Sequence, residues 1–308
     1  MLVVLTGGTG GAKLIQGLVQ EVDPSELTII CNTADDLILH GLNISPDLDT
    51  IMYTLAGLSD AAKGWGIEGD TFTALEQLRK FGAENWFNLG DKDLAAHIMR
   101  TSLMRRGLGL SEVTERLTKS LGIKSALLPM TDEQVETRVD TFQGEMAFQE
   151  YFVKHRWQPE VRKVFYAGIE KSWPAPGVLK AIRDANRIFL CPSNPITSIG
   201  PILAVPEIRE AIRKASAPVI GISPIIGNAA VSGPAHKLME AQGCEASALG
   251  VGKLYADLLD VFLFDNADEH CRDRIQALGT EVVVTSIRMD SKEDRRRLAR
   301  EVLAWDKR

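Results

Sequence analysis

Carboxylates are concentrated in two short segments near the start of the chain, NTADD and SPDLDT. In proteins a Mg²⁺ ion is commonly held by one or two carboxylates together with the phosphate oxygens of a substrate. We therefore predict that Asp35 and Asp49 bind a metal ion or act directly on a substrate. Asp36 and Asp47, which flank them, are expected to form turns or helix caps instead.

The turn after the first apolar run is rich in glycine. It reads GGTGGAK, from Gly7 to Lys13. Residues such as Gly8 and Gly10 allow the backbone to turn tightly and approach a ligand, and free N–H groups at a helix N-terminus favour phosphate. The dinucleotide pattern G-x-G-x-x-G fails because its last position is Lys13, and no Walker-type Gly-Lys-Ser/Thr is present. The turn therefore indicates phosphate or carboxylate binding without naming a cofactor, and a purely structural turn is the alternative.

A third polar segment, GDKDLAAHIMR, is expected to open a helix. Asp93, His97 and Arg100 are spaced by four and three residues, so that all three can share one helix face. Asp91 or Asp93 could instead serve only as the N-cap of this helix. A single surface histidine usually has no special role, so the interest of His97 depends on its charged neighbours.

Two later strand ends share one construction. Each is followed by a loop in which prolines hold the backbone extended and hydroxyl and amide side chains are dense. The first loop, CPSNPITSIG, contains Ser193 and Asn194, and the second, SPIIGNAAVSGP, contains Gly227 and Asn228. Two consecutive loops of this kind favour contacts to a nucleotide or its base over simple turns.

These motifs require a sheet that brings strand ends together. Short, continuously apolar runs alternate with helical periodicity, which is typical of parallel strands buried on both faces. The expected strands are Leu2–Thr6, Leu27–Cys31, Arg187–Cys191, Pro218–Ile222, Asp260–Phe264 and Glu281–Thr285. We predict one α/β domain over residues 1–308, a Rossmann-like doubly wound parallel sheet with a mainly helical insertion or cap at about 60–180.

Helix boundaries follow from caps and periodicity. The expected helices run from about Lys13 to Glu21, from Asp70 or Thr73 to Gly82, from Ser111 to Gly122 and from Ser291 to Trp305. Within the second, Thr73-Ala-Leu-Glu76 is a possible capping box. The segment from Val135 to Trp157 is ambiguous between helix and strand.

Composition narrows the class of protein. A net charge of -6 argues against general nucleic-acid binding, which needs a basic face. The four cysteines are scattered without a C-x-x-C, which argues against a zinc site or a disulfide framework. No basic leader and no apolar run of about 18 residues is present, so we expect a cytoplasmic protein without a membrane span.

Taken together, the motifs resemble the 2-phospho-L-lactate transferase family (CofD/FbiA) of coenzyme F420 biosynthesis. The resemblance rests on GGTGGAKL, NTADD, SPDLDT, GDTF, LGDKDLAAHI, PSNPITSIGPIL and SPIIGNAAVSGPAHKLM, which occur in order from residue 4 to about residue 265. A sister family of gluconeogenesis-factor-like proteins shares the glycine-rich start and the S-N-P loop. The DLDT and LGDKD stretches favour the transferase branch.

The resemblance implies transfer of a phosphorylated three-carbon acid from a guanosine-diphosphate-activated donor to the deazaflavin Fo (7,8-didemethyl-8-hydroxy-5-deazariboflavin), with release of GMP. It also implies a Rossmann-like fold, a requirement for Mg²⁺ and a homodimer. Matched by motif, Asp35 and Asp49 are the metal and acceptor-site carboxylates, Asp49 is also the candidate base, and the Asn88 neighbourhood would contact Fo. The candidate substrate-binding residues are Gly8, Thr9, Gly10, Lys13, Asn32, Asn88, Asp91, His97, Ser193, Asn194, Gly227 and Asn228.

Two other functions remain open from the residues. An NAD(P)-dependent oxidoreductase on the same fold is weakened by the missing third glycine and by carboxylates that would repel a dinucleotide's diphosphate. A nucleotide- or sugar-sensing regulator like the sister family could keep the glycine turn and the Ser193-Asn194 loop without a deazaflavin pocket. The sequence also leaves open whether the transferred acid derives from lactate, enolpyruvate or glycerate.

Overall fold

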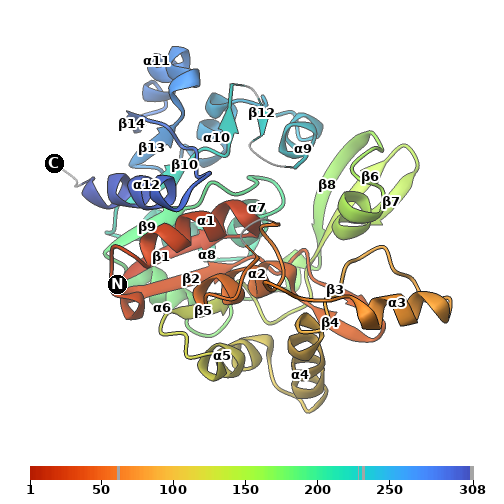
Figure 1. The fold of residues 1–308 in the computed structure, drawn as a ribbon. Helices are drawn as coiled ribbons and strands as arrows, with labels where there is room; N and C mark the ends of the chain where they lie inside the picture. The colour runs from red at the N-terminus through yellow and green to blue at the C-terminus, as the bar shows by residue number, and fades with distance from the viewer. Residues whose placement is uncertain (61–62, 228, 231–232, 306–308) are drawn as a thin grey trace.

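The computed structural model describes residues 1–60, 63–227, 229–230 and 233–305. Its centre is a seven-stranded sheet in the order β14-β13-β10-β9-β1-β2-β5, in which every pairing is parallel (Figure 1). The strands of this sheet are β1 (Leu2–Thr6), β2 (Leu27–Cys31), β5 (Ala126–Pro129), β9 (Arg187–Leu190), β10 (Val219–Ile222), β13 (Val261–Phe264) and β14 (Glu281–Val284). The predicted Rossmann-like α/β class is confirmed, and each of the six expected strands is present.

Helices cover both faces of this sheet. The α-helices of the described residues are α1 (Gly8–Leu18), α2 (Pro46–Leu55), α3 (Thr73–Lys80), α4 (Asp93–Arg105), α5 (Leu110–Ser120), α6 (Val178–Arg183), α7 (Ile199–Ala204), α8 (Ile208–Lys214), α9 (Ala235–Ala241), α10 (Ala248–Tyr255), α11 (Arg272–Gln276) and α12 (Lys292–Ala304), of which α3 lies away from this sheet (Figure 1). Alternate residues of β1 belong to different cores: Val4 packs with α1, α2 and α12, whereas Leu5 packs with α6 to α10. Because both sides of β1 are buried, its sequence is apolar without alternation. Among the described residues, no helix is both long and apolar enough to cross a bilayer.

The strand order reverses next to β1. From β1 the chain builds outward to β2 and β5 on one side, and it later returns to β9 on the other side. In open α/β sheets, ligands bind outside the carboxyl ends of the strands at such a reversal. The turns after β1, β2 and β9 are therefore the places where a site is expected, and they contain the motifs described above.

The region between β2 and β9 differs from the prediction in its second half. Its first half contains α3, α4 and α5, but it continues into β5 and then into a three-stranded antiparallel sheet of order β7-β6-β8 (Figure 1). The strands of this small sheet are β6 (Glu136–Thr141), β7 (Gly144–Ala147) and β8 (Val161–Ala167). In β6, Thr137, Val139 and Thr141 point inward and are buried. Threonine at two of three inward positions hides the alternation that would have identified this strand.

Short elements complete the fold. The hairpin of β3 (Leu37–Leu39) and β4 (Leu42–Ile44) follows β2, and the β11 (Ile225–Ile226) and β12 (Ala229–Ala230) hairpin follows β10. The predicted capping box of α3 is wrong, because Asp91 rather than Glu76 caps the start of this helix. The C-terminal helix begins as expected, with a capping box between Ser291 and Asp294.

Candidate active site

A cavity of about 520 Å³ opens at the carboxyl ends of β1, β2, β9 and β10. Most of the predicted site residues line it: Gly8, Thr9, Gly10, Lys13, Asp35, Asp49, Asn88, His97, Ser193 and Asn194. The structure thus brings together residues that are up to about 190 positions apart, at the place that the strand order favours.

Three predicted residues that the structure describes, Asn32, Gly227 and Asp91, do not line the cavity. Asn32 is fully buried and donates from Nδ2 to Asp47 Oδ2 at 2.9 Å and to the Thr197 carbonyl at 3.1 Å, so it positions Asp47. The backbone N–H of Gly227, an exposed residue, donates to Asp268. Asn228 lies outside the described residues.

Asp91 is the third of these residues, and its carboxylate is used within the fold. It accepts hydrogen bonds from the Thr71 hydroxyl and from the backbone N–H groups of Thr73 and Ala74. The hydrogen bond from Thr71, together with those from the helix start, lowers the pKa of Asp91 to about 2. Asp91 is therefore a structural cap of α3 outside the cavity lining, and its predicted contact with substrate stays a prediction.

The glycine turn has a different basis from the one predicted. Helix α1 begins at Gly8, not near Lys13, so the glycines form its first turn. A Cβ on Gly10 would collide with the carbonyl oxygen of Pro192, and a Cβ on Gly11 would collide with Thr6 Oγ1. Within this turn, Gly8 is the glycine with a left-handed backbone, with φ of 63°. A Cβ there would meet nothing closer than Asp47 Oδ1 at 3.9 Å. The glycines thus bring α1 close to the β9–α7 loop and leave its N-terminus directed at the cavity.

Asp47 is a site residue that the sequence analysis missed. Its Oδ1 accepts the backbone N–H of Gly8 at 2.8 Å, and its side chain lines the cavity. The expectation that Asp47 forms a turn or a helix cap is met at the start of α1, but it left out that Asp47 also lines the cavity. Asp47 and Asp49 are two residues apart in the first turn of α2, so they project in directions about 200° apart around the helix. Asp47 therefore faces α1, whereas Asp49 faces α4.

The carboxylates of Asp35 and Asp47 are buried, and no cationic side chain among the described residues forms an ion pair with them. Burial, and next the charge of Asp47, raise the pKa of Asp35 well above its usual value. Burial raises the pKa of Asp47 to about 6, although hydrogen bonds from Asn32 and Gly8 oppose this shift. Asp35 Oδ1 is buried and accepts no hydrogen bond from the described residues. A buried carboxylate oxygen without a partner is costly, and either a proton or a divalent cation would satisfy it.

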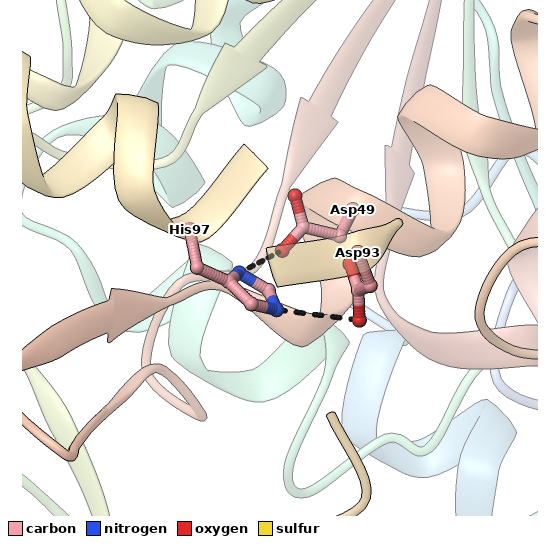
Figure 2. A group of neighbouring side chains, drawn as sticks. All are labelled: Asp49, Asp93 and His97. Atoms are coloured by element: carbon pink, nitrogen blue, oxygen red, sulfur yellow. Dashed lines mark ion pairs between the residues drawn. The ribbon is translucent and has the colours of Figure 1, made fainter. Parts of the chain in front are cut away.

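Asp49 has a different environment, because α4 supplies positive charge to it. Arg100 donates from Nη1 to Asp49 Oδ2 at 3.1 Å and from Nη2 to Asp49 Oδ1. On the same helix face, as predicted, His97 Nε2 lies 3.2 Å from Asp93 Oδ2 and Nδ1 lies 3.6 Å from Asp49 Oδ2 (Figure 2). Burial raises the pKa of Asp93, but hydrogen bonds from His97 and Tyr53 outweigh it, and the net pKa is lowered.

Two sets of acids in the cavity bear on metal binding. Ligand atoms of Asp49, Asp93 and His97 lie within 4.8 Å of one another. Figure 2 shows that the two carboxylates face different nitrogens of the His97 ring. The guanidinium of Arg100 also binds both oxygens of Asp49, so these residues form a charge-balanced network. Asp35, by contrast, has a buried oxygen without a partner among the described residues and is the acid with an unmet need for a cation.

The walls of the cavity include aromatic residues that the sequence analysis did not select: Tyr53, Trp65, Phe87, Phe148 and Phe152. Phe148 and Phe152 are stacked, with ring centroids 5.5 Å apart. Most of these residues come from the region between β2 and β9, where the helix and strand pattern was hardest to interpret. The aromatic wall offers a planar, apolar ligand a surface beside the polar groups.

The comparisons with known proteins agree with this architecture. The family model of the 2-phospho-L-lactate transferase CofD matches residues 2–306. The 2-phospho-L-lactate transferase of Methanosarcina mazei is 43% identical over 298 residues, covering 97% of this chain and 98% of its own length. A phosphoenolpyruvate transferase of Streptomyces coelicolor is 44% identical over 308 residues, covering 98% and 97%.

Among solved structures, a UPF0052 family protein from Bacillus halodurans superposes with a TM-score of 0.67 at 18% identity, covering 98% of this chain and 99% of its own. At that identity the likeness shows a shared fold. The family match and the relatives, by contrast, cover nearly the whole chain at substantial identity. They favour a transferase over the oxidoreductase and the regulator. The chain belongs to the 2-phospho-L-lactate transferase family and is a transferase.

Proposed function

We propose that this protein transfers a phosphorylated three-carbon acid from its guanosine-diphosphate-activated donor to the deazaflavin Fo, giving F420-0 or dehydro-F420-0 and GMP, in coenzyme F420 biosynthesis. The observation that carries the proposal is the division of one cavity into two parts. One part has carboxylates without a cation beside the N-terminus of α1, and the other has a charge-balanced carboxylate. The first suits a metal-bound diphosphate and the second suits an uncharged hydroxyl.

The donor side would be built from the strand ends. The N-terminus of α1, with Thr9 and Lys13, favours a diphosphate because its N–H groups and the lysine are positive. Ser193 Oγ is buried and makes no hydrogen bond with the described residues, so it is free for a phosphate oxygen. Asn194 Oδ1 accepts backbone N–H groups of its own loop and holds Ser193 in place.

Asp35 and Asp47 would hold Mg²⁺ on this side. When bound, the ion neutralises charge on the diphosphate and on the departing GMP. The backbone N–H of Gly8 and the amide of Asn32 keep the Asp47 carboxylate in one orientation. Asp36 does not compete for this role, because it does not line the cavity; its Oδ2 accepts a hydrogen bond from Ser45 Oγ at 2.6 Å.

The acceptor side would be formed by Asp49, Asn88 and the aromatic wall. Asp49 accepts a hydrogen bond from the ribityl hydroxyl of Fo and directs its oxygen at the phosphorus that carries the acid. The new P–O bond forms as the bond to the GMP oxygen breaks, GMP leaves with the bonding electron pair, and the hydroxyl proton passes to Asp49. No covalent enzyme intermediate is needed, since positioning and charge neutralisation supply most of the rate enhancement.

The reaction can be tested directly. Purified protein is incubated with Mg²⁺, Fo and a coupled guanylyltransferase that makes the donor from GTP and 2-phospholactate, phosphoenolpyruvate or 3-phosphoglycerate. Mass spectrometry should show Fo gaining one phospho-acid unit, with GMP as the second product. The acid with the largest kcat/KM identifies the donor. The sequence comparisons do not choose between the acids, because the identity to a 2-phospho-L-lactate transferase and to a phosphoenolpyruvate transferase is similar.

The contrary outcome is equally clear. If none of the three acids yields an adduct and the fluorescence of Fo is not quenched by the protein, then the transfer to Fo is wrong. In that case a different acceptor must occupy the aromatic wall. We also propose that the protein is a homodimer, as the family resemblance implies, and sedimentation equilibrium of the purified chain decides this.

A further inference from the structure

Five buried or partly buried side chains form a single connected network, and four of them, all but Arg100, line one wall of the cavity. Two helices supply them: Asp49 and Tyr53 come from α2, and Asp93, His97 and Arg100 come from α4. Tyr53 donates its hydroxyl proton to Asp93 Oδ1 at 2.5 Å. Asp93 in turn contacts His97 Nε2, and the other side of the ring contacts Arg100 and Asp49.

Each link of this network restricts the next one. Nδ1 of His97 lies 3.3 Å from Arg100 Nη1 and 3.6 Å from Asp49 Oδ2, so the ring supports the Arg100–Asp49 pair rather than either residue alone. Arg100 Nη1 also lies 3.3 Å from the Asn43 carbonyl, which ties the guanidinium to β4. His97 is 1% exposed and Arg100 2% exposed, so neither has room to turn away. Rotation of the Asp49 carboxylate would therefore break several charge-assisted contacts together.

One observation and one element of the proposal separate this role from substrate binding. The ring nitrogens of His97 and the two Nη atoms of Arg100 contact carboxylates, each other and the Asn43 carbonyl. In addition, Asp49 is the member of the network that we propose to touch the acceptor hydroxyl. A misplacement of that oxygen by about 1 Å is enough to slow a transfer ~10²-fold while substrates still bind.

We infer that His97 and Arg100, supported by Asp93 and Tyr53, are positioning residues that fix the Asp49 carboxylate against the acceptor hydroxyl. The inference rests on the proposed function, because it assigns the acceptor hydroxyl to Asp49. It replaces the expectation that His97 contacts substrate. It also assigns a purpose to the buried ion pair, since a pair of this kind adds little stability over apolar residues of the same size.

Two substitutions at one position test the inference. In His97→Asn the amide lies near the place of Nδ1 and can still accept from Arg100, whereas in His97→Gln the amide reaches the place of Nε2 and keeps only the Asp93 contact. We expect kcat to fall about 10²-fold in His97→Gln but only about 10-fold in His97→Asn, with KM for the guanylyl donor within about twofold of wild type. The exposed His270 provides the control His270→Asn, which should keep full activity.

Tyr53→Phe protects the test against misfolding, because it removes one hydroxyl and keeps the ring. We expect kcat to fall about threefold to tenfold, with the melting temperature and the quenching of Fo fluorescence unchanged. The inference would be overturned if His97→Asn and His97→Gln lost kcat equally and in proportion to their loss of stability. An unchanged kcat in Tyr53→Phe would also overturn it.

A readout without turnover separates this inference from the proposed function. Crystal structures of His97→Gln and Arg100→Lys should show the Asp49 carboxylate turned from its wild-type orientation. If wild-type protein makes no adduct but Asp49 turns in these variants, then the proposed reaction fails and the positioning role stands. If wild-type protein makes the adduct but Asp49 keeps its orientation in both variants, then the positioning role fails and the reaction stands.

Discussion

The two pairs of acids in this cavity differ in whether the chain places cationic side chains beside them. Asp35 and Asp47 are buried with only hydrogen-bond donors around them, and their pKa values are raised. Asp49 is buried and Asp93 is partly buried, both against Arg100 and His97, and the pKa of Asp93 is lowered. Both pairs lie in the same cavity, so burial alone does not account for the difference. The difference lies in the cations that the chain itself provides.

This contrast indicates what each pair is for. Carboxylates that the chain leaves without a cation are costly unless a ligand brings one, so on the proposed assignment the first pair would bind a metal-bound anion. Carboxylates that the chain neutralises are held still and need nothing further from a ligand. The second pair is therefore suited to orienting an uncharged group.

The largest expected effect is the loss of activity in Asp35→Asn. Removing this carboxylate should lower turnover by at least about 10³-fold, because the metal ion that binds the diphosphate loses a ligand. The melting temperature should stay the same or rise, since a buried charge without a partner disappears. Steady-state turnover and thermal unfolding, both with and without Mg²⁺, measure this. An active Asp35→Asn protein, or full activity of wild type in excess chelator, would contradict the metal assignment.

The next effect is on the stability of the second pair. Removing a charge from that pair should lower stability, whereas Asp35→Asn should leave stability unchanged or raise it. Arg100→Leu leaves Asp49 buried without its cation, so we expect the free energy of unfolding to fall by about 3–5 kcal/mol. The double variant Arg100→Leu/Asp49→Leu should regain most of this loss while remaining inactive. Urea unfolding of the three proteins tests this. A single variant as stable as the wild type would show that the pair is not buried as described.

A smaller effect concerns the pH dependence of stability in metal-free protein. The pKa of Asp47 is about 6 in the folded chain, above the usual value of 3.8. Its contribution to stability is therefore fully present below about pH 3.8 and is lost as the pH rises through 6. We expect a loss of about 2 kcal/mol across this window, reduced in Asp47→Asn and reversed by Mg²⁺ at pH 7. Urea unfolding from pH 4 to 7 measures it, and a flat profile in the wild type would count against the raised pKa.

The smallest effect on catalysis is expected for Asp91→Asn. Its carboxylate caps α3 and belongs to neither pair, so kcat/KM and the quenching of Fo fluorescence should stay within about twofold of wild type. The melting temperature should fall slightly because the helix start loses acceptors. A loss of activity comparable to that of Asp35→Asn would restore Asp91 to the site.

Much of this organisation could be predicted from the sequence. Strands such as β1 and β9 are uninterrupted apolar runs, and the glycine turn and the Ser193-Asn194 loop directly follow them. Because parallel strands end at one edge, local patterns were enough to collect these residues into one cavity. The spacing of Asp93, His97 and Arg100 likewise predicted their shared helix face.

The remainder depends on packing that no local pattern reveals. Asp47 and Asp49 occupy one helical turn, and only the positions of α1 and α4 around α2 decide which of them receives Arg100. The role of Gly10 depends on the Pro192 carbonyl, about 180 residues away in the chain. Strand β6 escaped prediction because threonine occupies inward positions.

The region between α2 and β9 has a consequence for how this protein could change. Arg100, His97 and the Phe148–Phe152 stack all belong to that one stretch of chain, whereas the glycine turn, Asp47 and Ser193 lie outside it. On the proposed assignment, a new acceptor could be acquired by replacing or remodelling this stretch alone, while the machinery for the activated donor is inherited intact. The architecture thus separates the part that evolution can exchange from the part that it must keep.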